Sequence, residues 1–266
     1  METKKADKAD KDMQIEDMTI VAHICHYSSP GRMNYLKEVL ATLLTYKCKT
    51  IDISVHSNAA VVVEEKNPRG TITVHKHELK EPYDLPWRCR DLLALQSKSY
   101  DVFMYLEDDI AVPFVAFQYW HKWHKYMRKH ELDVGFVRIE QRQSNKEFYV
   151  TDQRHQLTEI RTINDVPFVQ LENIYCAFWI YDQDELMEYM KSPWWHYEPH
   201  HWGTGQREDA AIGVKFVRLA SMAPLLSDRK TLAPECCVHH LPNNYANAPS
   251  EGNCYGRIKV CDLIKN

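Results

Sequence analysis

Three consecutive carboxylates close a short apolar run near the middle of the chain. The stretch YDVFMYLEDDIAVP covers residues 100–113, and Glu107, Asp108 and Asp109 directly follow the apolar residues 102–106. Such a run, rich in β-forming residues, is typical of a buried strand in a parallel sheet. Because adjacent like charges repel, a divalent cation with oxygen ligands, Mn²⁺ or Mg²⁺, would stabilise this cluster. The alternative is a solvated acidic turn.

Two further groups could act with these acids. Glu208 and Asp209 end the stretch GTGQRED and precede two alanines, a pattern typical of carboxylates at a helix N-terminus, where negative charge is favoured. The alternative is an ordinary acidic helix start. His239 and His240 lie beside LPNNY. A neutral imidazole is a competent ligand for Mn²⁺, although a histidine also serves purely structural roles.

The elements that must position these side chains begin near Met18. The β-rich run MTIVAHICHY is followed by a helical pattern for which Ser29 is the predicted cap and Pro30 the first residue. The runs TIDISVHSN and GTITVHKH follow as strands, and Asp84 and Pro86 open a second helix before the carboxylate strand. This order predicts an α/β sandwich with a mostly parallel sheet. Ligands of such sheets bind beyond the C-terminal strand ends, where the three acids fall.

The second half of the chain predicts a smaller, mixed or antiparallel portion. An aromatic-rich helix is expected from Pro113 to about His130, and residues 133–141, 146–152 and 166–182 read as strands. Asp182 and Glu185 form a capping-box pattern for a helix that ends near Met190. No repeat or linker divides the chain. We therefore expect one domain at residues 18–266, preceded by a disordered leader at residues 1–17.

Composition excludes several classes of protein. The net charge of −4 argues against nucleic-acid binding of the usual basic kind. No segment has the roughly 20 consecutive apolar residues that a membrane span needs, and the charged N-terminus lacks the apolar stretch of a signal peptide. The eight cysteines show no zinc-ligand spacing. These features predict a cytoplasmic protein with reduced thiols.

Taken together, the motifs resemble those of the GT-A glycosyltransferases. In that family an EDD or DxD motif after an apolar strand, a later xED motif and a C-terminal histidine occur in this order; LEDD at 106–109, RED at 207–209 and His239 or His240 are similar. The resemblance implies a GT-A-like, Rossmann-type sandwich. Residues 18–112 would bind a nucleoside-diphosphate sugar, and residues 113–266 would bind a glycan or glycoside acceptor. It also implies Mn²⁺ or Mg²⁺ on the diphosphate.

The resemblance assigns roles to individual acids. Asp109, as the last acid of its motif, is expected to face the metal together with His239 or His240. Glu107 stands where many members have Asp, so it could contact the metal, the ribose or neither. Asp209 is expected to take the proton from the acceptor hydroxyl in an inverting reaction, with Glu208 as the second candidate. A retaining reaction would need no such base.

Donor binding is expected around the ends of the first strands. In CHYSSPGR, Tyr27 could stack on the base and Ser28 could meet a phosphate, while Arg32 is either a phosphate ligand or a solvated helix residue. Asp108 is expected in the same region.

Further donor candidates lie on the second strand and just before the carboxylate strand. Arg88 and Arg90 in WRCRD either reach the diphosphate or lie on a helix surface. On the second strand, Asp52 or His56 could hydrogen-bond the base or ribose.

One segment is a candidate for acceptor binding. WWHYEPHHWG, residues 194–203, concentrates aromatic rings that could stack on sugars or pack an irregular loop. Two other functions fit the acidic motifs. One is a metal-dependent nucleotidyltransferase or phosphohydrolase, and the other is a carbohydrate-binding protein of the same fold without catalysis. The chain has no P-loop.

Overall fold

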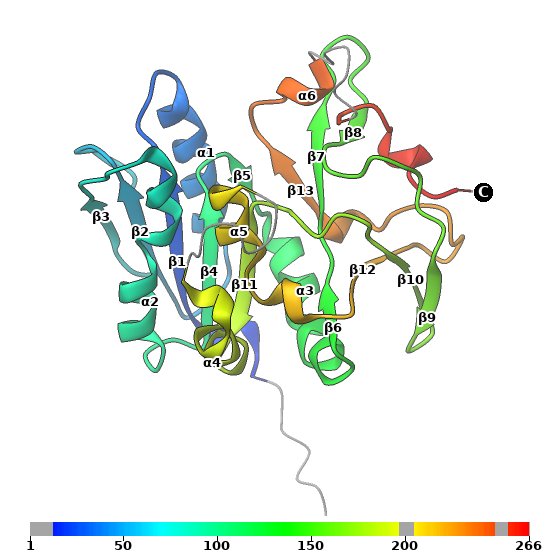
Figure 1. Cartoon of the computed structure of the whole chain (residues 1–266), viewed down its shortest axis with the longest axis horizontal. Coiled ribbons are helices and arrows are strands. Elements are labelled where there is room, and N and C mark those ends of the chain that lie inside the picture. The colour runs from blue at the N-terminus through cyan, green and yellow to red at the C-terminus, as the bar shows by residue number, and fades with distance from the viewer. Residues whose placement is uncertain (1–12, 197–204, 248–254, 266) are drawn as a thin grey trace, which may run out of the picture.

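A five-stranded sheet forms one half of the structure (Figure 1). The computed structural model describes residues 13–196, 205–247 and 255–265. The strand order is β11-β4-β1-β2-β3, with β1 to β4 parallel and β11 antiparallel to β4. The bounds of these strands are β1 Thr19–His26, β2 Thr50–Ser57, β3 Ile72–Lys76, β4 Val102–Glu107 and β11 Phe178–Asp182.

Helices cover both faces of this sheet because both faces carry apolar side chains. Leu36 and Leu40 of α1 and Phe117 of α3 share one core cluster with the β1 residues Ile20 and Ile24. On the other face, side chains of α2, α4 and α5 pack around buried aromatic residues of β4 and β11. The helices are α1 Arg32–Leu44, α2 Arg90–Gln96, α3 Phe114–Lys129, α4 Gln183–Lys191 and α5 Gln206–Ile212.

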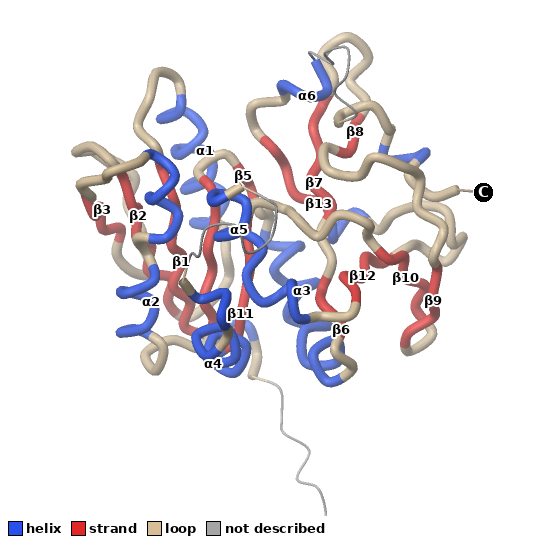
Figure 2. The backbone as a smooth tube through the Cα atoms, in the orientation of Figure 1, coloured by secondary structure: helices blue, strands red, loops and turns tan. Residues whose placement is uncertain are grey.

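Two four-stranded sheets form the other half of the molecule (Figure 2). Their orders are β5-β13-β7-β8 and β6-β12-β10-β9. The bounds are β5 Ile110–Ala111, β6 Leu132–Val134, β7 Val137–Gln141, β8 Phe148–Val150, β9 Ile160–Ile163, β10 Val166–Gln170, β12 Ala220–Pro224 and β13 Cys237–His240, with a last helix α6 at Asn244–Asn247. Short 3-10 helices occur at η1 Ile15–Asp17, η2 Pro82–Trp87, η3 Pro193–Trp195, η4 Gly213–Val217, η5 Pro234–Cys236 and η6 Val260–Asp262.

The structure confirms an α/β arrangement with a mostly parallel first sheet and the predicted order of its first elements. The capping box of α4 is also present, with Asp182 accepting from the Glu185 amide. Residues 133–141 differ from the prediction, because they form two strands in two sheets rather than one. Gly135 separates them: a Cβ at this position would lie 2.8 Å from the Met222 backbone, so the chain passes β12 too closely for a side chain.

The N-terminal helix begins later than predicted. Gly31, at φ 84°, is the N-cap of α1, so Arg32 rather than Pro30 is its first residue and Ser29 is not the cap. Of the expected leader at residues 1–17, residues 1–12 lie outside the described ranges and η1 is a 3-10 turn. Within the described residues, no helix has the length and apolar character needed to cross a membrane.

Candidate functional site

The three acids lie where β4 ends and the chain crosses from the first sheet toward the second half. All residues of β4 are buried. The Asp108 amide donates to the Cys25 carbonyl at 3.1 Å, which extends the β1–β4 pairing by one residue. The Asp109 carbonyl accepts from the Leu241 amide at 2.9 Å, just after β13. The three acids are therefore fixed by strands from both halves of the chain.

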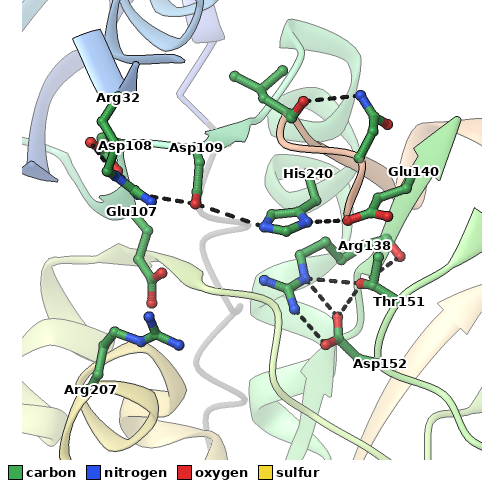
Figure 3. A network of polar contacts seen from close by, with 12 residues as sticks. Arg32, Glu107, Asp108, Asp109, Arg138, Glu140, Thr151, Asp152, Arg207 and His240 are labelled. Carbon is green, nitrogen blue, oxygen red and sulfur yellow. Dashed lines mark hydrogen bonds and ion pairs between the residues drawn. The ribbon is translucent and has the colours of Figure 1, made fainter. Parts of the chain in front are cut away.

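Asp108 is fully buried and ion-paired on both carboxylate oxygens. His26 Nδ1 lies 2.5 Å from Asp108 Oδ2, and Arg32 donates to both oxygens. Arg32 Nη2 also donates to Asp109 Oδ2 at 3.0 Å. One guanidinium thus bridges two of the three acids. Figure 3 shows Arg32 lying between Asp108 and Asp109.

Asp109 and His240 come together across the paired strands β5 and β13 (Figure 3). His240 Nε2 lies 3.7 Å from Asp109 Oδ2, and His240 Nδ1 forms a short hydrogen bond with Glu140 of β7. The second Glu140 oxygen accepts from the Ala246 amide at 2.6 Å. A carboxylate behind a histidine fixes the ring orientation and increases its basicity, an arrangement common behind metal-ligating histidines.

The contact between Asp109 and His240 favours the charged form of each side chain. Burial acts to raise the pKa of the Asp109 carboxyl, but the facing His240 and Arg32 outweigh burial and lower this pKa to about 2. Burial lowers the pKa of His240, yet its contacts with Asp109 and Glu140 shift it above its usual value. Asp109 is therefore a carboxylate at neutral pH, as a cation ligand must be.

Glu107 turns away from the other two acids. Its Oε1 accepts from the Tyr175 hydroxyl at 3.0 Å, and Arg207 of α5 lies nearby (Figure 3). Burial and the charge of Asp109 raise the pKa of Glu107 to about 7, while Arg207 and Arg138 partly oppose that shift. Glu107 can therefore change its protonation state near neutral pH.

A cavity of about 290 Å³ opens beside two of the three acids, and neither Asp109 nor His240 lines it. Glu107 and Asp108 form part of its wall, and the two arginines Arg32 and Arg207 bring positive charge to it. Its remaining walls come from the end of β1, from the turn before α1 and from η2: Cys25, Tyr27, Ser29, Pro82, Tyr83, Leu85 and Pro86. A second, more polar cavity of about 470 Å³ shares Tyr27 and Pro82 with the first and includes Asn58 and His77.

The structure brings four of the predicted donor-binding residues to the first cavity: Tyr27, Arg32, Glu107 and Asp108. Ser28 is close in sequence, but its amide donates to Asn58 Oδ1 at 2.7 Å. Asp52 does not reach the cavity, since it accepts from Thr71 at 2.7 Å and from the Tyr100 hydroxyl at 2.8 Å.

Arg88 and Arg90, expected either at a diphosphate or on a helix surface, do not line the first cavity. Arg88 is half-exposed and 3.8 Å from Asp84. Arg90 is buried beneath five aromatic rings and donates to the Tyr189 hydroxyl at 2.8 Å and to the Ala210 carbonyl at 2.9 Å. Cation–π contacts stabilise this buried charge, and Arg90 anchors α5.

His56 belongs to a chain of hydrogen-bonded imidazoles on the first sheet. Its Nε2 lies 2.9 Å from His23 Nδ1, and its Nδ1 lies 2.9 Å from His77 Nε2. The ring of His75 stacks on the His56 ring, and His23 Nε2 contacts Gln96 of α2 at 2.9 Å. His56 is thus buried inside the sheet and lines neither cavity, whereas His77 lines the second one.

The two candidate bases differ in environment. Asp209 is buried in the first turn of α5, where its amide donates to the Gly205 carbonyl at 3.0 Å. Glu208 is half-exposed and ion-paired with Arg207 at 2.9 Å. In the expected acceptor loop, Trp195 is buried and packs edge-on against Tyr189. Residues 197–204 of this loop lie outside the described ranges.

The structure distinguishes the two C-terminal histidines. His240 faces Asp109, whereas His239 points to the other side of its sheet and lines an apolar cavity with Phe148. Of the two histidines predicted as metal ligands, only His240 lies beside Asp109.

Asp109 and His240 fit as partial ligands of a divalent cation. Asp109 Oδ1 is buried and has no hydrogen-bond partner within the described part of the chain, and such an orphaned oxygen favours a cation. Across the described ranges, no group of three or more His, Cys, Asp or Glu side chains is arranged to hold a metal. Mg²⁺ and similar ions are commonly bound by one or two protein carboxylates, with substrate phosphates and water completing the shell.

Several site residues were not predicted. Arg207 lies inside the RED motif, in which only the two acids predict a chemical role, and Tyr175 carries no local signal. Glu140 could have been found, since an acid inside the apolar strand pattern VRIEQ needs a buried partner. Arg138 on the same strand forms a buried fork with Asp152 at 2.7 and 2.8 Å (Figure 3).

No protein-family model matches the chain, and a search of curated proteins gives no match. The chemical groups around the cavity are therefore the basis for a function.

Proposed function

We propose that the protein is a metal-dependent glycosyltransferase that transfers a sugar from a nucleoside-diphosphate sugar to a hydroxyl of a glycan or glycoside. The observation that carries this proposal is the meeting of Asp109 and His240, from motifs far apart in sequence, with Asp109 ion-paired to Arg32, which lines a cavity together with Arg207. The first sheet also places the cavity at the C-terminal ends of β1 and β4, where open α/β sheets bind their ligands. Its strand order and the antiparallel β11 are compatible with a GT-A-like domain.

In this proposal each residue has a defined task. Asp109 and His240 hold Mn²⁺ or Mg²⁺, which when bound stabilises the charge on the departing diphosphate. Glu140 keeps the His240 ring oriented through its Nδ1. Arg207 and Arg32 supply positive charge where the diphosphate lies.

The acceptor side centres on α5. Asp209 follows the cavity residue Arg207 by two positions but does not itself line the first cavity. Three contacts hold the backbone of α5: Trp87 on the Gln206 carbonyl, and Trp179 and Arg90 on the Ala210 carbonyl. We assign Asp209 as the base that accepts the acceptor's proton during an inverting transfer. These buried contacts hold in place the helix that carries Asp209.

The test is direct. The full chain is incubated with a panel of nucleoside-diphosphate sugars, a panel of glycoside acceptors and Mn²⁺, with EDTA as the metal-free control, and release of nucleoside diphosphate is followed by chromatography. Metal-dependent release, with the anomeric configuration of the product read by NMR, is the expected result. Absence of release from every donor would contradict the proposal. Cleavage of another phosphate bond would instead indicate a nucleotidyltransferase or phosphohydrolase.

A further inference from the structure

The Arg32 side chain lies between the acids that would bind a metal ion and the cavity that would hold a diphosphate. Its side chain is about one-third exposed and lines the first cavity, while its guanidinium bridges Asp108 and Asp109. The positive φ of Gly31 ends the preceding turn so that α1 starts with Arg32 facing the acids. The arginine is thus a resident cation on the acidic motif.

A metal ion bound to Asp109 would lie close to the positive charge of Arg32. Asp109 Oδ2 already accepts from Arg32 at 3.0 Å and faces His240 at 3.7 Å, whereas Asp109 Oδ1 lies buried and unpaired among the described residues. A divalent ion on Asp109 would stand close to the guanidinium, and two positive charges in a poorly solvated site repel strongly. Arg32 therefore opposes metal binding as long as it stays on the acids.

A diphosphate offers Arg32 another partner. A guanidinium binds phosphate oxygens through two parallel N–H donors, as it binds a carboxylate. Because Arg32 and Arg207 both line the first cavity, a diphosphate bound in that cavity would lie within reach of Arg32. Asp108 would keep a side-chain partner after the exchange, since His26 Nδ1 lies 2.5 Å from its Oδ2.

We propose that Arg32 exchanges between the Asp108–Asp109 pair and the diphosphate of the donor, and that this exchange couples metal binding to nucleotide binding. The inference rests on the proposed function, because it takes the donor to be a nucleoside diphosphate sugar. Its consequence is reciprocal: the nucleotide raises the affinity for the metal, and the metal raises the affinity for the nucleotide by the same factor. The metal alone binds weakly because Arg32 competes with it.

The coupling can be measured without any turnover. Mn²⁺ binding to the full chain is followed by the electron paramagnetic resonance signal of free Mn²⁺, with and without ADP, CDP, GDP or UDP. For the unmodified chain we expect at least one of these nucleotides to tighten Mn²⁺ binding by about tenfold or more, within the range typical of coupled sites. In Arg32→Gln, Mn²⁺ alone should bind several-fold more tightly, and the nucleotide should add little.

Two further variants make the test independent of folding effects. Arg161→Gln, the same substitution at an exposed residue of β9, should behave like the unmodified chain. Arg32→Lys keeps the positive charge near the acids but loses the fork that bridges them, so its coupling should be intermediate; it also provides the result if Arg32→Gln does not fold. Mn²⁺ affinity and coupling unchanged in both Arg32 variants would overturn the inference while leaving the transferase proposal standing. A chain that binds none of the nucleotides, with or without Mn²⁺, would remove the proposed function and the inference with it.

Discussion

His23 Nδ1 lies 2.9 Å from His56 Nε2 inside the first sheet, so two buried imidazoles share one hydrogen bond. Burial, with a smaller contribution from the neighbouring His75, lowers the pKa of His23 to about 3 and that of His56 to about 2. The charge of Arg90 also acts to lower the pKa of His23, and His23 and His77 act in the same direction on the pKa of His56. Both rings are therefore neutral in the folded protein well below neutral pH.

This arrangement predicts acid sensitivity of the fold. An unfolded chain takes up protons on both histidines below about pH 6.5, whereas the folded protein does not until about pH 3. Stability is thus fully present above pH 6.5 and is lost as the pH falls, by up to about 1.4 kcal/mol per pH unit for each ring. Urea unfolding of His56→Gln between pH 6 and pH 4 should show a shallower decline than the unmodified chain by roughly that amount. His155→Gln, at an exposed histidine, should leave the slope unchanged, and parallel curves for His56→Gln would refute the assignment.

The contact between His240 and Glu140 predicts that a change at Glu140 weakens metal binding even though the proposed ligand His240 is retained. Glu140→Gln keeps the size of the side chain but removes the negative charge behind the imidazole. Affinity for Mn²⁺ in the presence of nucleotide, measured by calorimetry, should fall by about 10- to 100-fold, the usual effect of such supporting residues. His239→Ala is the matched control, because its ring faces away from Asp109. Equal losses in the two variants would contradict the assignment of His240.

Asp109 is expected to be essential for metal binding and dispensable for the fold. Asp109→Asn retains the shape of the side chain but not the charge that draws a cation to the orphaned oxygen. Stabilisation by Mn²⁺ with nucleotide, read as a thermal shift, should disappear while the circular dichroism spectrum is unchanged. Asp165→Asn in the exposed turn between β9 and β10 should keep the full shift. A normal shift in Asp109→Asn would show that the metal binds elsewhere.

Asp209 and Glu208 are distinguished by turnover. Asp209→Asn should leave donor and Mn²⁺ binding nearly intact but slow transfer by about 10²- to 10⁴-fold, since a positioned base acts only as the transition state forms. Glu208→Gln should be milder, because Glu208 is half-exposed and paired with Arg207. Single-turnover assays with saturating donor separate the two. The opposite pattern would make Glu208 the base, and full activity of both variants would rule out an inverting mechanism that uses this motif.

The sequence predicts the elements better than their distant contacts. The apolar run before Glu107 and the helical periodicity after Pro30 are local signals, and both gave the correct element. Arg90 looks like a surface residue because its aromatic cage comes from residues as distant as Tyr189 and Trp195.

The sequence also does not indicate which of the two C-terminal histidines faces Asp109. Alternation along a strand places His239 and His240 on opposite faces, but which face meets Asp109 depends on the pairing of β13 with β5 and β7. The histidine chain was missed for a related reason. The contacts between these histidines depend on the parallel register of β1, β2 and β3. That register pairs His56 with Cys25, two residues after His23 on β1, and with His75 on β3.

The pairing of β5 with β13 also determines when the site can come into existence during folding. Asp109 gains His240 and the Leu241 amide only after a segment more than a hundred residues downstream has returned to β5. Contacts of such long sequence separation form slowly, because the intervening chain must first be ordered. On the ribosome, the strands β1 to β4 can pair well before residue 240 emerges. We therefore expect assembly of the cation-binding pair to be among the last steps of folding, so that a chain trapped earlier would carry the acidic motif with no histidine opposite it.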